Sequence, residues 1–266
     1  AKTIHRLLEF SWQDGLSFRR NESNPLDTAM IIIDESSMLE INILNHLLKA
    51  VRDDTSLVFI GDVDQLPSVG AGYVLHDLIA CGTIPVVRLE QIFRQQSDSS
   101  IITNAHRIRK GEQPQFSRNN GDFFLFPADN PQKATDTIVQ LVTEKIPQIF
   151  HFDPQRDIQV LAPMHKGEAG VSELNRRLQT VLNPFSGAED EIIQAGKIFR
   201  KGDRIIQLSN NYEKGVFNGD LGFIKKIDRE LQIVQASFEE KSVEYEFSEL
   251  DQLNHSYAIT IHKSQG

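Results

Sequence analysis

Hydrophobic residues follow two different periods along the chain, and the period changes near residue 197. Before that point, continuous apolar runs such as MIII (30–33) and LVFI (57–60) are typical of parallel strands buried on both faces. One helical face lies between these runs and carries Ile41, Leu44, Leu48 and Val51. The pattern therefore predicts a strand, a crossover helix and a second parallel strand.

Strands and helices continue to alternate up to about residue 183. Helix starts are indicated at Asp98 or Ser99, for a helix that ends at Gly111, and at Asn130-Pro131. Further elements are expected at VVRLEQIF (86–93, strand), IQVLAP (158–163, strand) and GVSELNRRLQTVL (170–182, helix). The first 183 residues therefore predict an α/β fold.

The later part of the chain has the two-residue period of half-buried strands. This period runs through DRIIQL (203–208), GFIKKI (222–227), LQIVQASF (231–238) and VEYEFSEL (243–250). Turn signals at Asn218-Gly219-Asp220 and Asp228-Arg229-Glu230 divide these segments. We expect a small antiparallel barrel, inserted before an apolar strand at YAITI (257–261). A separate hairpin is expected at FSWQDGLSF (10–18), with Asp14-Gly15 at its turn.

Composition narrows the classes of protein to consider. The chain has 266 residues, of which 39% are hydrophobic and 24% charged, which suffices for one large domain or two to three smaller ones. No apolar run approaches the roughly 20 residues of a membrane helix and no signal peptide is evident, so we expect a cytoplasmic protein without a membrane partner. Since the net charge is -9, any nucleic-acid contact must be a local groove. With Cys81 as the only cysteine, an internal disulfide is excluded.

Acidic residues follow both apolar runs. Asp34 and Glu35 come directly after the first run, and Asp62 and Gln65 follow the second. The carboxyl ends of parallel strands form the ligand crevice of an open sheet, so these four side chains should converge. Paired carboxylates there can hold Mg²⁺ and polarise a water. These acids also have purely structural explanations. They could mark a strand end that meets solvent, and Asp62 or Asp64 could cap a turn with its own side chain.

A phosphate-binding loop would be needed to complete such a nucleotide site. The pattern G-x-x-x-x-G-K-[ST] does not occur in the 266 residues. The sequence begins without a methionine and stops within a strand-like run, which predicts a segment of a longer protein with its phosphate loop upstream.

Several motifs in order resemble one family of enzymes. They are TIHRLL (3–8), IIIDESSM, GDVDQLPSVGAG, LEQIFRQ, LAPMHKGEAGVSELNRRLQ, NNYEKGVFNGDLG and YAITIHKSQG, and they fall in the order seen in RecD-like DNA helicases of superfamily 1. The resemblance implies an α/β fold of tandem RecA-like (P-loop NTPase) motor domains with a small SH3-like β-barrel insertion. The implied domains are 1–95 (later part of the first motor, with a hairpin pin at about 9–28), 96–196 (second motor), 197–254 (barrel) and 255–266 (return strand).

The same resemblance implies roles for individual residues. Asp34 would associate with Mg²⁺, Glu35 would be the general base for the hydrolytic water, and Gln65 would sense the γ-phosphate of ATP. The other implied residues are Arg94, Asp62, Gln265 and Gly266 at the nucleotide, and Trp12, Phe18, Thr260, His262 and Ser264 at DNA. The expected cofactors are ATP and Mg²⁺. The expected partners are single-stranded and duplex-junction DNA, and other subunits of a recombination or repair nuclease complex such as exodeoxyribonuclease V. Unwinding with 5′ to 3′ polarity follows from the family alone.

Two other classes of function remain open from the sequence. Asp34 and Glu35 could belong to a metal-dependent nuclease, although that chemistry usually needs further carboxylates around two ions. A non-catalytic scaffold of a DNA-processing complex is the third reading. Dependence on nucleotide separates them, because a helicase needs ATP and single strands, a nuclease cuts with metal alone, and a scaffold does neither.

Overall fold

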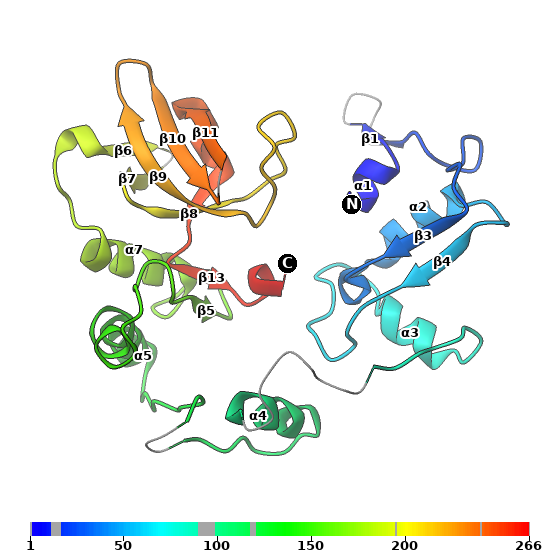
Figure 1. Cartoon of the computed structure of the whole chain (residues 1–266), viewed down its shortest axis with the longest axis horizontal. Coiled ribbons are helices and arrows are strands. Elements are labelled where there is room, and N and C mark those ends of the chain that lie inside the picture. The colour runs from blue at the N-terminus through cyan, green and yellow to red at the C-terminus, as the bar shows by residue number, and fades with distance from the viewer. Residues whose placement is uncertain are drawn as a thin grey trace. The chain divides into compact units, whose positions relative to one another are not determined.

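The structure is a computed structural model that describes residues 2–11, 17–89, 99–117, 121–194, 196–239 and 241–265. Its contacts divide the chain into two compact units, Ala1–Phe124 and Leu125–Gly266. Figure 1 shows the elements of both units, which are described separately below.

The first unit is built on two parallel strands joined by a helix. Strand β3 (Met30–Ile33) pairs with β4 (Ser56–Phe59), with Met30 opposite Ser56 and Ile33 opposite Phe59. Helix α2 (Ile41–Ala50) connects them and buries Leu44, Leu47 and Ala50 against Ile31 and Ile33. This strand, helix, strand crossover confirms the sequence prediction. The face expected to be buried was wrong in part, because Ile41 and Leu48 are exposed and Leu47 and Ala50 are buried instead.

The structure contradicts the expectation that β3 is buried on both faces. Ile31 and Ile33 are buried, whereas Met30 and Ile32 on the opposite face are 53% and 60% exposed. Successive side chains of a strand point to opposite faces, and α2 covers only one of these faces. The continuous apolar run therefore does not correspond to two-sided burial in this unit.

The strand expected at 86–93 is also not formed in its described part, residues 86–89. Residues 86–89 have no regular structure and are exposed, and residues 90–93 lie outside the described ranges. A strand needs a hydrogen-bonded neighbour, and in the described part of this unit β3 and β4 are paired with each other.

A short hairpin stands at the start of the first unit. Helix α1 (Ile4–Leu7) begins with Thr3, whose side chain accepts a hydrogen bond from the N–H of Arg6. Strands β1 (Phe10–Ser11) and β2 (Ser17–Phe18) follow and pair antiparallel, with Phe10 opposite Phe18. The predicted hairpin is confirmed, and its turn at Asp14-Gly15 lies outside the described residues.

The remaining helices of the first unit are η1 (Ser36–Met38), α3 (Val74–Ala80) and α4 (Ser100–Arg109). Ser99 occupies the N-cap position of α4, as expected, but the carboxylate of Asp122 performs the capping. It accepts hydrogen bonds from the Ser100 N–H at 2.9 Å and from the Ser99 hydroxyl. The helix ends before Gly111, which adopts a positive φ of 74°.

In the second unit, two parallel strands pack against a long helix. Strand β5 (Val160–Ala162) pairs with β13 (Ala258–Thr260) although about one hundred residues separate them in the chain. Helix α7 (Val171–Leu182) packs on this pair through Val171, Leu174 and Leu178. Helix α5 (Pro131–Gln140), the π-helical turn η2 (Leu141–Lys145) and α6 (Ile146–Phe150) precede them, and the side chain of Asn130 caps α5 as predicted.

The antiparallel part of the second unit has a core of its own. Its five-stranded sheet has the order β11-β10-β9-β8-β12. The strands are β8 (Arg204–Gln207), β9 (Leu221–Asp228), β10 (Ile233–Phe238), β11 (Lys241–Glu246) and β12 (Leu253–His255). A hairpin of β6 (Glu191–Gln194) and β7 (Lys197–Arg200) adds Phe199 to this core.

The predicted strand at 243–250 is only half correct. Strand β11 stops at Glu246, and Phe247–Gln252 form the 3₁₀ helix η4. A capping box explains the stop. The Glu246 side chain accepts a hydrogen bond from the backbone N–H of Glu249, and the Glu249 side chain accepts one from the backbone N–H of Glu246. After η4 the chain reaches β12, β13 and the last short 3₁₀ helix, η5 (His262–Gln265). In the described residues no helix is long and apolar enough to cross a membrane.

Candidate active site

The acid pair lies where β3 ends. Asp34 and Glu35 are both exposed, and one carboxylate oxygen of Asp34 accepts the Glu35 N–H at 2.9 Å. Glu35 has a φ of 51°, a left-handed conformation that costs a non-glycine residue about 1 kcal/mol or more. The backbone therefore turns sharply between the two acids.

Ser36 holds this turn in place. It is fully buried, its N–H donates to the Ile60 carbonyl at 2.8 Å, and its hydroxyl donates to the Ile33 carbonyl at 2.8 Å. The first bond joins the end of β3 to the end of β4. A Cβ placed on Gly61 would lie 3.0 Å from the backbone nitrogens of both Ser36 and Ser37, so the two strand ends meet with no spare space.

The segment after β4 is a tight turn. A carboxylate oxygen of Asp62 accepts the Asp64 N–H at 2.9 Å, and the Asp62 carbonyl accepts the Gln65 N–H at 3.2 Å. Asp62 thus caps this turn with its own side chain, which is the structural role that the sequence allowed for it. Asp64 instead pairs with Arg109 of α4, with 3.1 Å between Oδ2 and Nη1.

Gln65 turns toward a small pocket. The pocket is lined by Ser37, Val63, Gln65, Pro67, Tyr73, Leu75 and His76 and has room for about one water molecule. Gln65 Oε1 and Ser37 Oγ are buried, and neither finds a hydrogen-bond partner among the described residues. A buried polar atom normally has a partner, so both atoms are suited to hold a water or a ligand oxygen.

The donor set suits a magnesium ion bound together with a nucleotide. Mg²⁺ prefers oxygen ligands and is commonly held by one or two carboxylates plus substrate phosphates and waters. Asp34 supplies an exposed carboxylate, whereas the Ser36 hydroxyl is already bonded to Ile33. Within the described ranges no group of three or more His, Cys, Asp or Glu side chains is arranged to hold a metal by itself.

The residues expected at DNA in the second unit lie at the end of β13 and in η5. Thr260 is buried, and its hydroxyl accepts the Lys263 N–H at 3.2 Å, so it fixes the start of η5. His262 and Ser264 are exposed, and the Ser264 hydroxyl donates to the Ile261 carbonyl at 2.7 Å. Gln265 has a buried Oε1 that lacks a partner in the described part of the unit.

Phe18 has its ring inside the first unit. It packs against the core around Ile31 and Leu44, and its centroid lies 4.6 Å from that of His46 and 5.0 Å from that of Phe10. These contacts fasten the hairpin to α2. The other expected site residues, Trp12, Arg94 and Gly266, lie outside the described residues.

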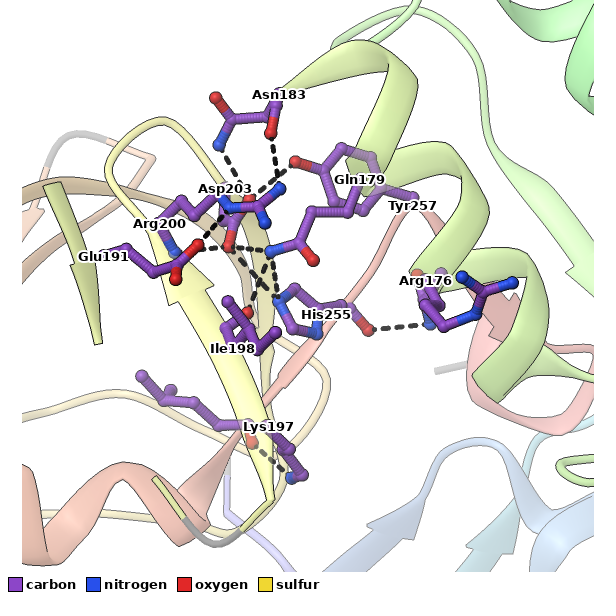
Figure 2. Close-up of polar contacts among 12 residues, drawn as sticks. Arg176, Gln179, Asn183, Glu191, Lys197, Ile198, Arg200, Asp203, His255 and Tyr257 are labelled. Carbon is purple, nitrogen blue, oxygen red and sulfur yellow. Dashed lines mark hydrogen bonds and ion pairs between the residues drawn. The ribbon is translucent and has the colours of Figure 1, made fainter. Parts of the chain in front are cut away.

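Sequence reasoning missed a buried polar cluster in the second unit, which Figure 2 shows. Its centre is Asp203, a fully buried carboxylate. Asp203 accepts hydrogen bonds from the Arg200 N–H (2.6 Å), Gln179 (2.7 Å), Asn183 (2.8 Å), Tyr257 (2.9 Å) and His255 (3.2 Å). The donors come from the barrel, from α7 and from the strand that returns to β5. Asp203 therefore joins the barrel to α7 and to the segment that leads into β13.

Burial and this carboxylate together shape the protonation of the cluster. Burial raises the pKa of the Tyr257 phenol, and the charge of Asp203 raises it further. Gln179 donates its amide protons to Asp203 and to the Ile198 carbonyl, and His255 Nε2 lies 3.2 Å from the same Asp203 oxygen. The available sequence signal was the polar pair Asn175 and Gln179 within the apolar face of α7.

Solved structures first define the class of the fold. A Bacteroides Pif1 helicase in complex with ADP-AlF3 and ssDNA matches 98% of this chain and 70% of its own, with a TM-score of 0.57 and 19% identity. A structure of two coordinating Pif1 helicases at forked dsDNA matches 99% and 68%, with a TM-score of 0.53 and 19% identity. At this identity the likeness shows the fold alone.

Sequence comparisons then point to a narrower group. Residues 1–123 match the family model described as AAA domain, and residues 174–238 match the ATP-dependent RecD-like DNA helicase SH3 domain. The ATP-dependent RecD2 DNA helicase of Deinococcus radiodurans is 34% identical over all of this chain and 34% of its own length. The RecBCD enzyme subunit RecD of Mycolicibacterium smegmatis is 29% identical over all of this chain and 48% of its own.

These matches confirm the resemblance to RecD-like DNA helicases, in the AAA-type part as well as in the SH3-type part. The α/β fold of RecA-like type with an SH3-like insertion is confirmed with it. The chain spans a third to a half of the length of these two curated relatives.

Proposed function

We propose that the protein is an ATP-dependent DNA helicase that translocates on single-stranded DNA and unwinds duplexes. The observation that carries the proposal is the position of Asp34 and Glu35 at the carboxyl end of β3, bonded through Ser36 to the end of β4. This is the edge of a parallel sheet where α/β proteins bind their ligands. The RecD-like matches supply the class of substrate.

The nucleotide chemistry is assigned to the first unit. Asp34 would hold Mg²⁺, which supplies positive charge to the phosphates of ATP. Glu35, placed by the left-handed turn, would accept the proton of the attacking water. Gln65 would reach the γ-phosphate or this water through its amide. We assign Asp62 to the shape of the adjoining turn at the nucleotide site, and retain Arg94 as a nucleotide contact. Gln265 and Gly266, at the end of the chain, stay nucleotide contacts predicted from the family resemblance alone.

The DNA contacts are assigned to the end of the chain and to the hairpin. His262 and Ser264, on exposed positions of η5, would contact the backbone of a single strand, and Thr260 would support them by starting η5. Trp12 would stack on a base at the junction, with Phe18 anchoring the hairpin from which it acts. By the same reasoning we propose 5′ to 3′ polarity, a cytoplasmic location and work in DNA recombination or repair, alone or with nuclease subunits.

Hydrolysis and unwinding assays on the full-length protein test this proposal. A helicase should hydrolyse ATP faster when single-stranded DNA is added, and should separate a duplex with a single-stranded tail only when ATP and Mg²⁺ are both present. A metal-dependent nuclease would cut labelled DNA with Mg²⁺ alone. A scaffold would neither cut DNA nor respond to it by hydrolysing ATP, and either result would overturn the proposal.

A further inference from the structure

The small pocket beside Gln65 is bordered by both segments that carry the proposed nucleotide chemistry. Ser37 reaches it from η1, the 3₁₀ helix that directly follows Glu35, and Gln65 reaches it from the turn that Asp62 caps. The pocket has room for about one water molecule. A molecule bound there would therefore contact the turn after β3 and the turn after β4 together.

The backbones of both turns are fixed, but the amide of Gln65 is not fixed by them. The Met38 N–H donates to the Glu35 carbonyl at 3.1 Å across Ser37, and the Gln65 N–H donates to the Asp62 carbonyl at 3.2 Å. The last torsion of a glutamine side chain has a broad range of allowed values. A further contact is therefore needed to give the Gln65 amide one direction.

The two polar atoms that face the pocket have complementary chemistry. Ser37 Oγ and Gln65 Oε1 are buried, and neither has a hydrogen-bond partner among the residues that the structure describes. A serine hydroxyl both donates and accepts hydrogen bonds, whereas an amide oxygen only accepts them. One water can therefore satisfy both atoms, by accepting from the hydroxyl and donating to the amide oxygen. The other residues that line the pocket are Val63, Pro67, Tyr73, Leu75 and His76.

We propose that Ser37 is a positioning residue for Gln65, and that one water bound in this pocket joins the Ser37 hydroxyl to Gln65 Oε1. The inference rests on the proposed function and adds a residue to its nucleotide site. With its oxygen held by the water, Gln65 turns its amide nitrogen toward the γ-phosphate or the attacking water. A donor that acts on this charge needs a fixed direction, because a displaced group loses much of its effect. The turn that places Glu35 thus also holds Gln65.

ATP hydrolysis by the full-length protein, measured with saturating single-stranded DNA, tests this role. Ser37→Ala should lower kcat by about tenfold, the scale of one lost hydrogen bond. The KM for ATP should stay within about twofold of the parental value, because Ser37 acts through Gln65 and not on the nucleotide. The melting temperature should stay close to the parental value, since no protein group bonds the hydroxyl that is removed.

A double-mutant cycle shows whether Ser37 acts through Gln65. Gln65→Ala alone should lower kcat by about tenfold or more, because it removes the proposed contact with the γ-phosphate or the water. Adding Ser37→Ala to Gln65→Ala should cause no further loss, since the group to be positioned is already absent. Losses that add up in the double variant would overturn the inference, because Ser37 would then act independently of Gln65.

Two further variants separate hydrogen bonding from side-chain volume and from general damage to the turn. Ser37→Cys keeps the size of the side chain but has a weak donor, so it should be as slow as Ser37→Ala. A parental rate in Ser37→Cys would overturn the inference, because volume alone would then be the role of Ser37.

Ser68→Ala is the matched control in the segment after β4. The Ser68 hydroxyl already donates to the Gly70 carbonyl at 3.0 Å. Its removal should leave kcat within about twofold of the parental value. A tenfold loss in Ser68→Ala as well would overturn the specific role of Ser37.

The outcomes also separate the inference from the proposed function. If Gln65→Ala lowers kcat and Ser37→Ala does not, the inference fails and the proposed function stands. If Gln65→Ala hydrolyses ATP at the parental rate, the proposed role of Gln65 fails and the inference fails with it. If the full-length parent hydrolyses no ATP, the proposed function itself is refuted, and the role of Ser37 with it.

Discussion

The Ser36 N–H donates to the Ile60 carbonyl oxygen at 2.8 Å, directly after the acid pair. This bond makes the end of one parallel strand depend on the end of its neighbour. The positions of Asp34 and Glu35 are therefore set by β4 as well as by β3. A site in which a carboxylate must face a water and a phosphate needs this kind of support, because small displacements of a catalytic group are costly.

Gly61→Ala should disturb this junction without removing any proposed catalytic group. The added methyl would meet Leu75 Cδ2 at 2.8 Å and two backbone nitrogens at 3.0 Å, an overpacking that costs typically 1–3 kcal/mol. We expect a lower melting temperature of the first unit and, at temperatures where the variant is folded, a lower kcat for ATP hydrolysis. Calorimetry and steady-state kinetics measure the two effects. An unchanged kcat in a variant of lowered stability would show that the junction does not position the acids.

Asp203→Asn should destabilise the second unit more than any surface acid does. The amide that replaces one carboxylate oxygen would face donors, and at least one of five buried donors would lose its acceptor. We expect the free energy of unfolding to fall by about 3 kcal/mol. Denaturation followed by circular dichroism measures it. Asp190→Asn, at a half-exposed acid paired with Lys201, is the control and should change stability by less than about 0.5 kcal/mol. Equal effects of both substitutions would contradict the assigned role of Asp203.

Substitutions of Phe18 and Trp12 should affect different properties, the stability of the first unit and the unwinding of DNA respectively. Phe18→Ala removes a ring that packs on the core and on His46, so it should lower the stability of the first unit by about 2 kcal/mol, while Phe18→Leu should recover part of it.

Trp12→Ala should leave ATP hydrolysis near the parental rate and sharply reduce unwinding. Both activities are measured on one preparation. Unwinding at the parental rate in Trp12→Ala would remove this residue from the proposed pin.

The sequence predicted those features that depend on local pattern. The crossover from β3 to β4 followed from two apolar runs around one helical face, and Asn130-Pro131 marked α5 because capping chemistry acts over three or four residues. The barrel strands followed from a period of two. The acid pair could be placed at a strand end for the same reason, since it directly follows the apolar run.

Features that depend on distant partners could not be predicted in this way. Ile32 has the same local pattern as Ile31, and only the position of α2 decides which of them is buried. The cluster around Asp203 joins residues 179 to 257, and no spacing within the sequence pairs them. Phe247 continues the alternation of β11, yet the reciprocal bonds of Glu246 and Glu249 end the strand before it.

Glu35→Gln in the full-length protein tests the central claim most directly. The amide keeps the size of the side chain but cannot accept a proton from water, so single-stranded-DNA-stimulated ATP hydrolysis should fall by about 10²-fold or more. Binding of a fluorescent ATP analogue should stay close to the parental affinity, because the proposed phosphate and Mg²⁺ contacts are unchanged. Hydrolysis within a few fold of the parental rate, with binding intact, would contradict the account, since the base would then have to lie elsewhere.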